Sequence, residues 1–276
     1  MKNIFCIDLE DWFHQSLVSP LYYDQKSSVE RNAERLLEIF AMTGTTATFF
    51  CLGVVAEKHP ALIRKIAENG HEIASHGYEH KIIYRQTPAE FKADVTKSME
   101  VISPLSGKAV KGYRAPSWSI TKDSLWALDI LQELGFSYDS SIFPTQNFLY
   151  GIPDASRYVN SLTVNGKPFL EVPPSTFRLC ERTYGFSGGF YFRALPTLFI
   201  RGCTDKTNRL GHPAVFYLHP VEIDRNIEKV SKRLVDKTIL EYGITGCEKK
   251  LIHILQRYDF DSIENVLKPS IPEANL

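Results

Sequence analysis

The sequence lacks the features of several large functional classes. Its 32 Lys and Arg residues balance 32 Asp and Glu residues over 276 positions, so the basic surplus of a nucleic-acid-binding protein is absent. No apolar run approaches the roughly 18 residues that a membrane-spanning helix needs. The five cysteines are scattered and form no CxxC pair, which favours reduced thiols over a zinc ribbon or a disulfide framework.

Phosphate-binding loops and serine nucleophile motifs are also missing. No G-x-G-x-x-G follows the first predicted strand, which argues against a dinucleotide-binding protein. The pair Gly188-Gly189 is not followed by GK[ST], so a phosphate cradle is not expected there. No G-x-S-x-G occurs either, and a serine hydrolase is therefore improbable.

The N-terminus reads MKNIFCIDLEDWFH, and Asp8 interrupts its apolar stretch. A secretory signal needs an uninterrupted apolar segment. The sequence therefore predicts a protein without a signal peptide and with a cytoplasmic location.

Short apolar runs alternate with helical patterns along the chain. This alternation is typical of parallel sheets, and seven or so units favour a distorted, single-domain (β/α)7 barrel, with an open doubly wound sheet as the alternative. The predicted strands are 4–8, 46–51, 71–76, 112–115, 136–139, 169–172, 214–219 and a short 260–263. The predicted helices are 29–42, 54–69, 88–102, 121–134, 227–242 and 246–258.

Two segments depart from this alternation within the expected single domain, residues 1–276. Residues 144–213 are rich in Pro, Gly and aromatic residues, and we expect an insertion over the barrel mouth. Residues 223–276 are expected to form a C-terminal helical portion.

Five polar residues stand at or just after the C-terminal ends of predicted strands. Active sites of βα barrels form at that end because the βα loops converge there. One polar residue at a strand end means little, but five residues of catalytic type on five strands predict a site. They are Asp8, His76, Arg114, Asp139 and His219.

A metal site is predicted from SHGYEH and DLED. The four-residue spacing of His76 and His80 can bring two imidazoles to one side, and two His with one carboxylate form a hydrolytic zinc set. Asp8 and Glu10 share a face if the strand continues. Either Glu10 or Asp11 could be the carboxylate ligand, and a surface His80 with a core His76 is the structural alternative.

Three more residues could assist a reaction. Arg114 beside Asp8 would stabilise its carboxylate, and His219 could act as a general acid. Asp139 could orient His219, although an ordinary turn carboxylate is equally consistent with the sequence. Trp118 and Tyr191 could stack on sugar faces, with core packing as the alternative.

Taken together, five motifs resemble the polysaccharide deacetylase superfamily, with NodB homology and similarity to carbohydrate esterase family 4. The stretches EVPPSTFRL and SGGFYFRALP look like a subgroup encoded with exopolysaccharide and surface-glycan genes. The five motifs, in family order, are DLED at 8–11, SHGYEH at 75–80, YRAPSW at 113–118, YDSSIFP at 138–144 and LHP at 218–220.

The resemblance implies a role for each matching residue. Asp8 resembles the general base, and His76 and His80 resemble two metal ligands. Arg114 resembles the residue that holds the base, His219 the general acid, and Asp139 the carboxylate that orients it. The family commonly has adjacent aspartates where this chain reads DLED. The D-x-D register favours Glu10 as third ligand, whereas the adjacent-acid register gives Asp11 as ligand and Glu10 as base.

The resemblance implies a divalent-metal-dependent hydrolase that removes N-acetyl groups from sugars. Zinc is the default metal, and Co, Ni, Mn or Fe would fit the same ligands. The expected substrate is a nucleotide-linked, lipid-linked or polymeric N-acetylated sugar, with no nucleic-acid partner and an unassigned oligomeric state. Rival hypotheses are a small-molecule amidohydrolase resembling allantoinases or formamidases, and an inactive glycan-binding module.

Overall fold

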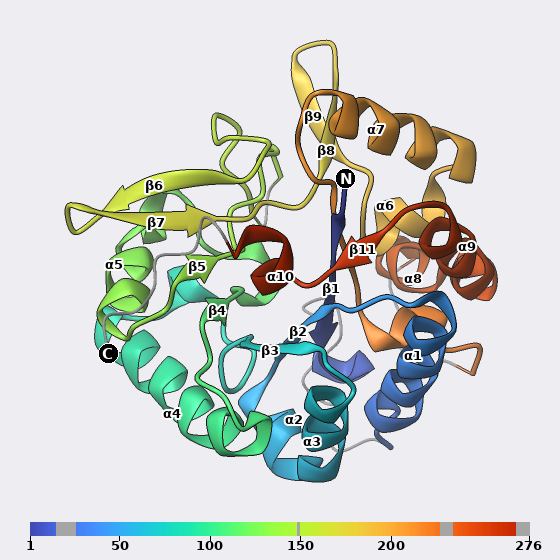
Figure 1. The fold of residues 1–276 in the computed structure, drawn as a ribbon. Helices are drawn as coiled ribbons and strands as arrows, with labels where there is room; N and C mark the ends of the chain where they lie inside the picture. The colour runs from blue at the N-terminus through green and yellow to red at the C-terminus, as the bar shows by residue number, and fades with distance from the viewer. Residues whose placement is uncertain (15–25, 148–149, 227–233, 269–276) are drawn as a thin grey trace.

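The computed structural model describes residues 1–14, 26–147, 150–226 and 234–268 (Figure 1). Seven parallel strands form the central sheet, and helices surround it, which confirms the predicted distorted (β/α)7 barrel (Figure 1). These strands are β1 (Asn3–Leu9), β2 (Thr48–Cys51), β3 (Glu72–Ser75), β4 (Gly112–Tyr113), β5 (Tyr138–Asp139), β7 (Lys167–Glu171) and β10 (Val215–Leu218).

The order of the sheet is β10-β1-β2-β3-β4-β5-β7, with β6 (Asn160–Val164) added antiparallel to β7. Every residue of β1 is buried, as expected for a parallel strand covered on both faces. The start of β1 also pairs with the short strand β11 (Phe260–Asp261). The backbone N–H of Ser175 donates to the carbonyl of Val215, so the chain beyond β7 lies against β10.

The helices are α1 (Val29–Thr43), α2 (Gly53–Lys58), α3 (Pro60–Glu68), α4 (Pro88–Ser106), α5 (Trp126–Glu133), α6 (Gly189–Ala194), α7 (Thr197–Arg209), α8 (Leu234–Glu241), α9 (Ile244–Arg257) and α10 (Ile263–Leu267). Apolar residues of α1 face the sheet, among them Leu36 and Phe40, which are fully buried. The α4 helix begins with a capping box between Thr87 and Glu90, as the sequence predicts.

One predicted helix is wrong in its length. Residues 54–69 do not form a continuous helix, because α2 ends at Lys58 and α3 begins at Pro60. Proline has no backbone N–H and disfavours helical geometry in the residue before it. His59 accordingly leaves the helical region, with φ −128° and ψ 57°.

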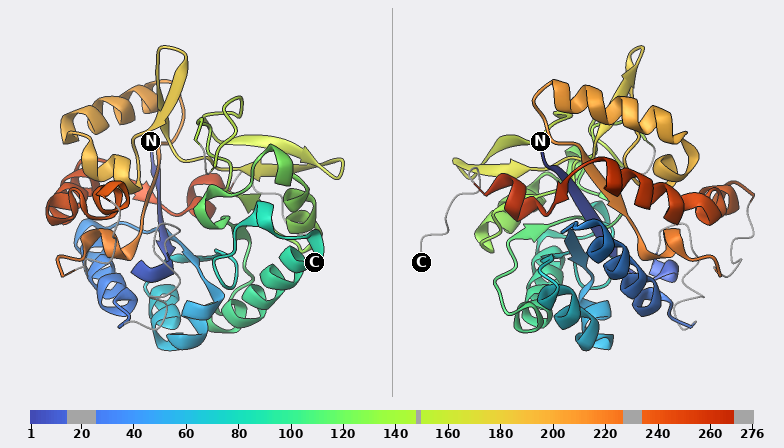
Figure 2. Two further views of the ribbon diagram at one scale, coloured as in Figure 1. Left: turned by 180° about the vertical axis from the view of Figure 1, so that it is seen from behind. Right: turned by 45° about the vertical axis from the view of Figure 1, so that its right-hand side comes forward.

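Residues 144–213 contain both barrel and peripheral elements. They supply β7 to the central sheet, the separate hairpin of β8 (Thr176–Leu179) and β9 (Arg182–Gly185), and helices α6 and α7. Figure 2 shows the β8–β9 hairpin extending away from the barrel.

The C-terminal portion contributes α8, α9, β11 and α10. Residues 227–233 of the predicted helix 227–242, and residues 269–276, lie outside the described residues. Among the described residues, no helix has the length and apolar character required to cross a membrane.

Candidate active site

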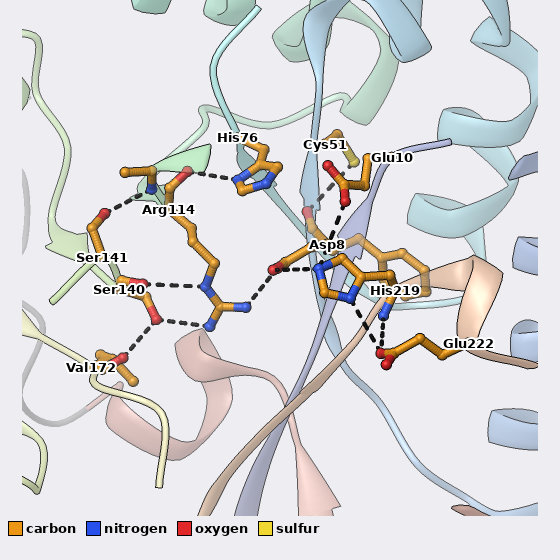
Figure 3. A network of polar contacts seen from close by, with 12 residues as sticks. Asp8, Glu10, Cys51, His76, Arg114, Ser140, Ser141, Val172, His219 and Glu222 are labelled. Atoms are coloured by element: carbon orange, nitrogen blue, oxygen red, sulfur yellow. Dashed lines mark hydrogen bonds and ion pairs between the residues drawn. The ribbon is translucent and has the colours of Figure 1, made fainter. Parts of the chain in front are cut away.

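The predicted site residues stand where the barrel strands end. Asp8 is in β1, and Glu10 follows that strand directly. His76 follows β3, Arg114 follows β4 and His219 follows β10. Since these strands run parallel in one sheet, their C-terminal ends bring the side chains to one end of the barrel (Figure 3).

Glu10, His76 and His80 form the group most suited to a metal ion. Their ligand atoms all lie within 4.8 Å of one another. His80 Nε2 is 2.8 Å from Glu10 Oε2, and both side chains are buried. His80 adopts a left-handed backbone conformation with φ 58°, which is uncommon outside glycine.

The donor set fits a divalent cation. Glu10 Oε2 is buried and accepts no hydrogen bond of good geometry, although His80 Nε2 lies 2.8 Å away. The two atoms therefore face each other closely enough to share a cation. A hydrogen bond of 2.7 Å joins His76 Nδ1 to the carbonyl of Arg114. The ring must donate at Nδ1, which directs the Nε2 lone pair towards a ligand.

The electrostatics agree with this assignment. Burial lowers the pKa of His76 to about 4, so its imidazole is neutral near pH 7. Burial opposes the ionisation of Glu10, but the neighbouring His80, His219 and His76 outweigh it and lower the pKa of Glu10 to about 2. Neutral imidazole and ionised carboxylate are the forms that bind metals.

Asp11, the alternative ligand, instead forms hydrogen bonds with nearby residues of the chain. Its carboxylate accepts the backbone N–H groups of Trp12 and Ser28 and the hydroxyl of Ser27. These bonds connect the end of β1 to the start of α1. The structure therefore brings Glu10, and not Asp11, to the two histidines.

Asp8 lies between a buried arginine and an imidazole. Arg114 Nη1 donates to Asp8 Oδ1 over 2.6 Å, and Arg114 is fully buried. Its guanidinium also donates to the carbonyl and hydroxyl of Ser140. The guanidinium carbon lies 4.1 Å from the ring centroid of Phe50, and this packing restricts its position.

His219 faces Asp8 and Glu10 from β10. Its Nε2 lies 3.7 Å from Asp8 Oδ2 and 3.7 Å from Glu10 Oε1. Its Nδ1 lies 3.2 Å from Glu222 Oε2. Burial lowers the pKa of His219, but Glu222 and then Glu10 and Asp8 outweigh it and raise that pKa to about 9.

The prediction that Asp139 orients His219 is contradicted by these contacts. The Asp139 carboxylate accepts the backbone N–H and hydroxyl of Ser141, and its other neighbour is the Glu171 carboxyl. Asp139 ends β5, whereas His219 follows β10, and four strands lie between β5 and β10 in the sheet. The residue against His219 Nδ1 is Glu222.

A cavity of about 190 Å³ opens onto these polar groups. Trp118 and Tyr191, the predicted sugar-stacking residues, both contribute to its wall, together with Tyr150, Phe190 and Tyr217. Ser117 and Trp118 have φ values of 53° and 55°. Left-handed backbone at two non-glycine positions costs free energy. The Trp118 ring that follows this turn lies over Arg114, 4.6 Å from the guanidinium carbon.

The glycine pair allows the aromatic wall to pack closely. A Cβ at Gly188 would lie 2.2 Å from the Tyr217 ring. The backbones of Gly188 and Tyr217 form a parallel bridge. Glycine at this position therefore serves a close approach between β10 and the segment leading into α6.

A second cavity of about 300 Å³ lies at the opposite end of β3. Its walls include Glu72, Lys108, Lys111 and Glu264. The residues predicted for the site, from Asp8 to His219, do not line it.

Comparison with known families agrees with this geometry. Residues 18–138 match the polysaccharide deacetylase family model. The chain carries a polysaccharide deacetylase domain. Residues 140–268 match a second model, described as a domain of unknown function, DUF3473. The first match contains His76, His80 and Arg114, whereas His219 and Glu222 lie in the second.

The deacetylase domain is similar to a curated relative from Helicobacter pylori. This "Peptidoglycan deacetylase" is 34% identical over 108 residues, which cover 39% of this chain and 36% of the relative. The chain therefore spans about a third of the length of this relative.

Solved structures share the fold over nearly the whole chain. A Mycobacterium smegmatis protein assigned as a polysaccharide deacetylase has a TM-score of 0.66 and 20% identity, covering 99% of this chain and 92% of that one. The PuuE allantoinase has a TM-score of 0.62 and 16% identity, covering 98% and 91%. At these identities the similarity establishes the fold alone.

Glu222 and Arg193 also line the cavity, but neither was predicted from the sequence as a residue of the site. A signal for Glu222 was present, because Pro220 follows His219 and an acidic residue stands three positions after that histidine. This is the pattern of an N-terminal cap, with proline first and Glu at the third position. The 3₁₀ turn Pro220–Ile223 has this geometry, and the His219 N–H donates to Glu222 Oε2.

Proposed function

We propose that the protein is a metal-dependent carbohydrate N-deacetylase, which hydrolyses an N-acetylated sugar to acetate and a free amino sugar. The observation that carries this proposal is the buried group Glu10, His76 and His80 beside Asp8 and His219. These residues line one cavity of a chain that carries a polysaccharide deacetylase domain.

Glu10, His76 and His80 would hold the metal ion. Two imidazoles and one carboxylate suit zinc, and Co, Ni, Mn or Fe would accept the same ligands. When bound, such an ion supplies Lewis acidity towards a carbonyl oxygen and makes a water molecule more acidic.

Two residues of the chain would carry out the proton transfers, one as a base and one as an acid. Asp8 accepts a proton from the attacking water, whose oxygen forms the new bond to the acetyl carbon. Arg114 holds the Asp8 carboxylate by its 2.6 Å hydrogen bond. His219 donates a proton to the amide nitrogen as the C–N bond breaks, so that an amine leaves and acetate remains.

The cavity wall supports a sugar as the substrate. Aromatic rings present apolar faces that suit the C–H faces of a pyranose, and Trp118, Phe190 and Tyr191 line the cavity. We propose an N-acetylated sugar of a surface polysaccharide or its precursor, in nucleotide-linked, lipid-linked or polymeric form.

Acetate release from a panel of substrates tests the proposal. The panel contains N-acetylglucosamine oligomers, a UDP-linked N-acetylhexosamine and allantoin, each measured with and without a chelator. We expect acetate from at least one N-acetylated sugar, its loss with the chelator, and its loss in His76→Ala. Turnover of allantoin alone would favour the small-molecule amidohydrolase, and sugar binding without turnover would favour the inactive glycan-binding module.

A further inference from the structure

The Glu222 carboxylate lies between two buried partners. Its Oε2 faces His219, 3.2 Å from Nδ1 and 3.0 Å from the backbone nitrogen. Its Oε1 accepts a hydrogen bond of 2.7 Å from Arg193 Nε. Both side chains of the Glu222–Arg193 pair are about 5% exposed or less, so neither solvent nor screening weakens these contacts.

Arg193 is itself held by the C-terminal portion of the chain. Its two terminal nitrogens donate to the carbonyls of Ile239, Leu240 and Tyr242, at and just beyond the end of α8. The Arg193 carbonyl accepts from Lys250 Nζ in α9 over 2.9 Å. A continuous series of hydrogen bonds therefore leads from α8 and α9 through Arg193 and Glu222 to His219.

We propose that Glu222 is the positioning residue for His219 and that Arg193 holds Glu222 in place. The inference rests on the proposed deacetylase function only for the step in which His219 donates a proton to the leaving amine. A carboxylate at Nδ1 fixes the ring rotation and requires the Nδ1–H tautomer. Nε2 then points towards Asp8 and Glu10, where the leaving amine would stand.

Glu222 replaces Asp139 in this role. Sequence resemblance assigns the orienting carboxylate to the end of β5, 80 residues before His219. The structure supplies it from the same turn as His219, three residues later. Its support comes from α6, α8 and α9, so residues of the DUF3473 segment complete the site of the deacetylase domain.

Two substrates with different leaving groups distinguish whether Glu222 positions the general acid or only supports the fold. An amine leaving group needs a proton, whereas the nitrophenolate of 4-nitrophenyl acetate leaves without one. In Glu222→Gln we expect kcat for the N-acetylated sugar to fall about 10- to 100-fold. We expect kcat for 4-nitrophenyl acetate to fall by less than about threefold, with the metal content unchanged.

Two further variants make the comparison specific. Glu72→Gln changes another carboxylate, one that binds Tyr138 and Thr48 at the far end of β3, and should alter neither rate. Asp139→Asn tests the rival assignment. Equal loss on both substrates in Glu222→Gln would overturn the proposal, as would selective loss of amide hydrolysis in Asp139→Asn instead.

An NMR measurement keeps this inference separate from the proposed function. The Nδ1–H proton of His219, bonded to a buried carboxylate, should give a downfield, exchange-protected signal that His219→Gln abolishes. We expect Glu222→Gln to remove or shift that signal. Its absence from the wild-type protein, or its persistence in Glu222→Gln, would overturn the inference. The NMR measurement does not depend on turnover. A failure to hydrolyse any N-acetylated sugar would therefore count against the proposed function and not against this inference.

Discussion

Arg114 Nη1 lies 2.6 Å from Asp8 Oδ1, and both side chains are removed from solvent. Asp8 comes from β1 and Arg114 follows β4, so 106 residues of sequence separate the partners. The pair connects two strands of the barrel at the site. A buried charge that loses its partner is strongly destabilising.

Arg114→Met should therefore lower the free energy of unfolding by about 3–5 kcal/mol. The substitution leaves the Asp8 carboxylate buried and unpaired, and it removes the bonds to Ser140. Urea denaturation of the metal-free protein measures the change. The exposed ion pair of Lys122 and Asp154 offers a matched control, and Lys122→Met should cost under about 1 kcal/mol. A similar small loss in both variants would contradict the buried pair.

The Asp139–Glu171 pair should make stability depend on pH. Burial raises the pKa of both carboxyls. Asp139 raises the pKa of Glu171 further, whereas the hydrogen bond with Glu171 lowers the pKa of Asp139, which stays raised at about 6. Glu171 Oε2 has no donor partner, and protonation would let it donate to Asp139. A carboxyl whose pKa is higher in the folded than in the unfolded state contributes its full stabilisation below the unfolded-state pKa, near 4. That contribution is lost as the pH rises through the folded-state pKa.

Wild-type stability should accordingly fall as the pH rises from about 4 through about 6, more steeply than that of Asp139→Asn. The variant keeps the shape of the side chain and removes one of the two titrations. Urea unfolding at a series of pH values gives both slopes. Parallel slopes would show that the pair does not retain a proton in the folded protein.

Gly188→Ala should destabilise the protein by about 1–3 kcal/mol. The new Cβ would stand 2.2 Å from the Tyr217 ring, and this ring lines the cavity. Displacement of the ring should also reduce turnover. Gly202→Ala in α7 is the control, since no atom lies within 4 Å of its Cβ position. The control should raise stability by about 0.5–1 kcal/mol, and thermal unfolding distinguishes the two. Equal melting temperatures would contradict the close packing.

Much of the fold could be predicted because buried parallel strands appear as apolar runs between helical patterns. The seven central strands all overlap predicted strands. The division of 54–69 was missed, although Pro60 was visible, because apolar periodicity continues on both sides of it. That periodicity reports the face of a helix and does not report a break in the backbone.

The site could be predicted in part, because strand ends are readable from the sequence and contacts across the barrel are not. Glu10 was favoured over Asp11 because the chain keeps the D-x-D spacing of the family it resembles, and the structure brings Glu10 to the two histidines. The partner of His219 was missed because the resemblance directed attention to β5. Arg193 could not be connected to the site from sequence, since α8 and α9 determine its surroundings.

Metal content of untagged protein, measured by mass spectrometry, tests the central claim most directly. We expect about one divalent ion per chain in the wild type and in Asp8→Asn, and loss of the ion in His76→Ala and Glu10→Gln. Absence of an ion even after dialysis against zinc would contradict the metal centre. Retention in Glu10→Gln with loss in Asp8→Asn would contradict the assignment of Glu10 as ligand and Asp8 as base.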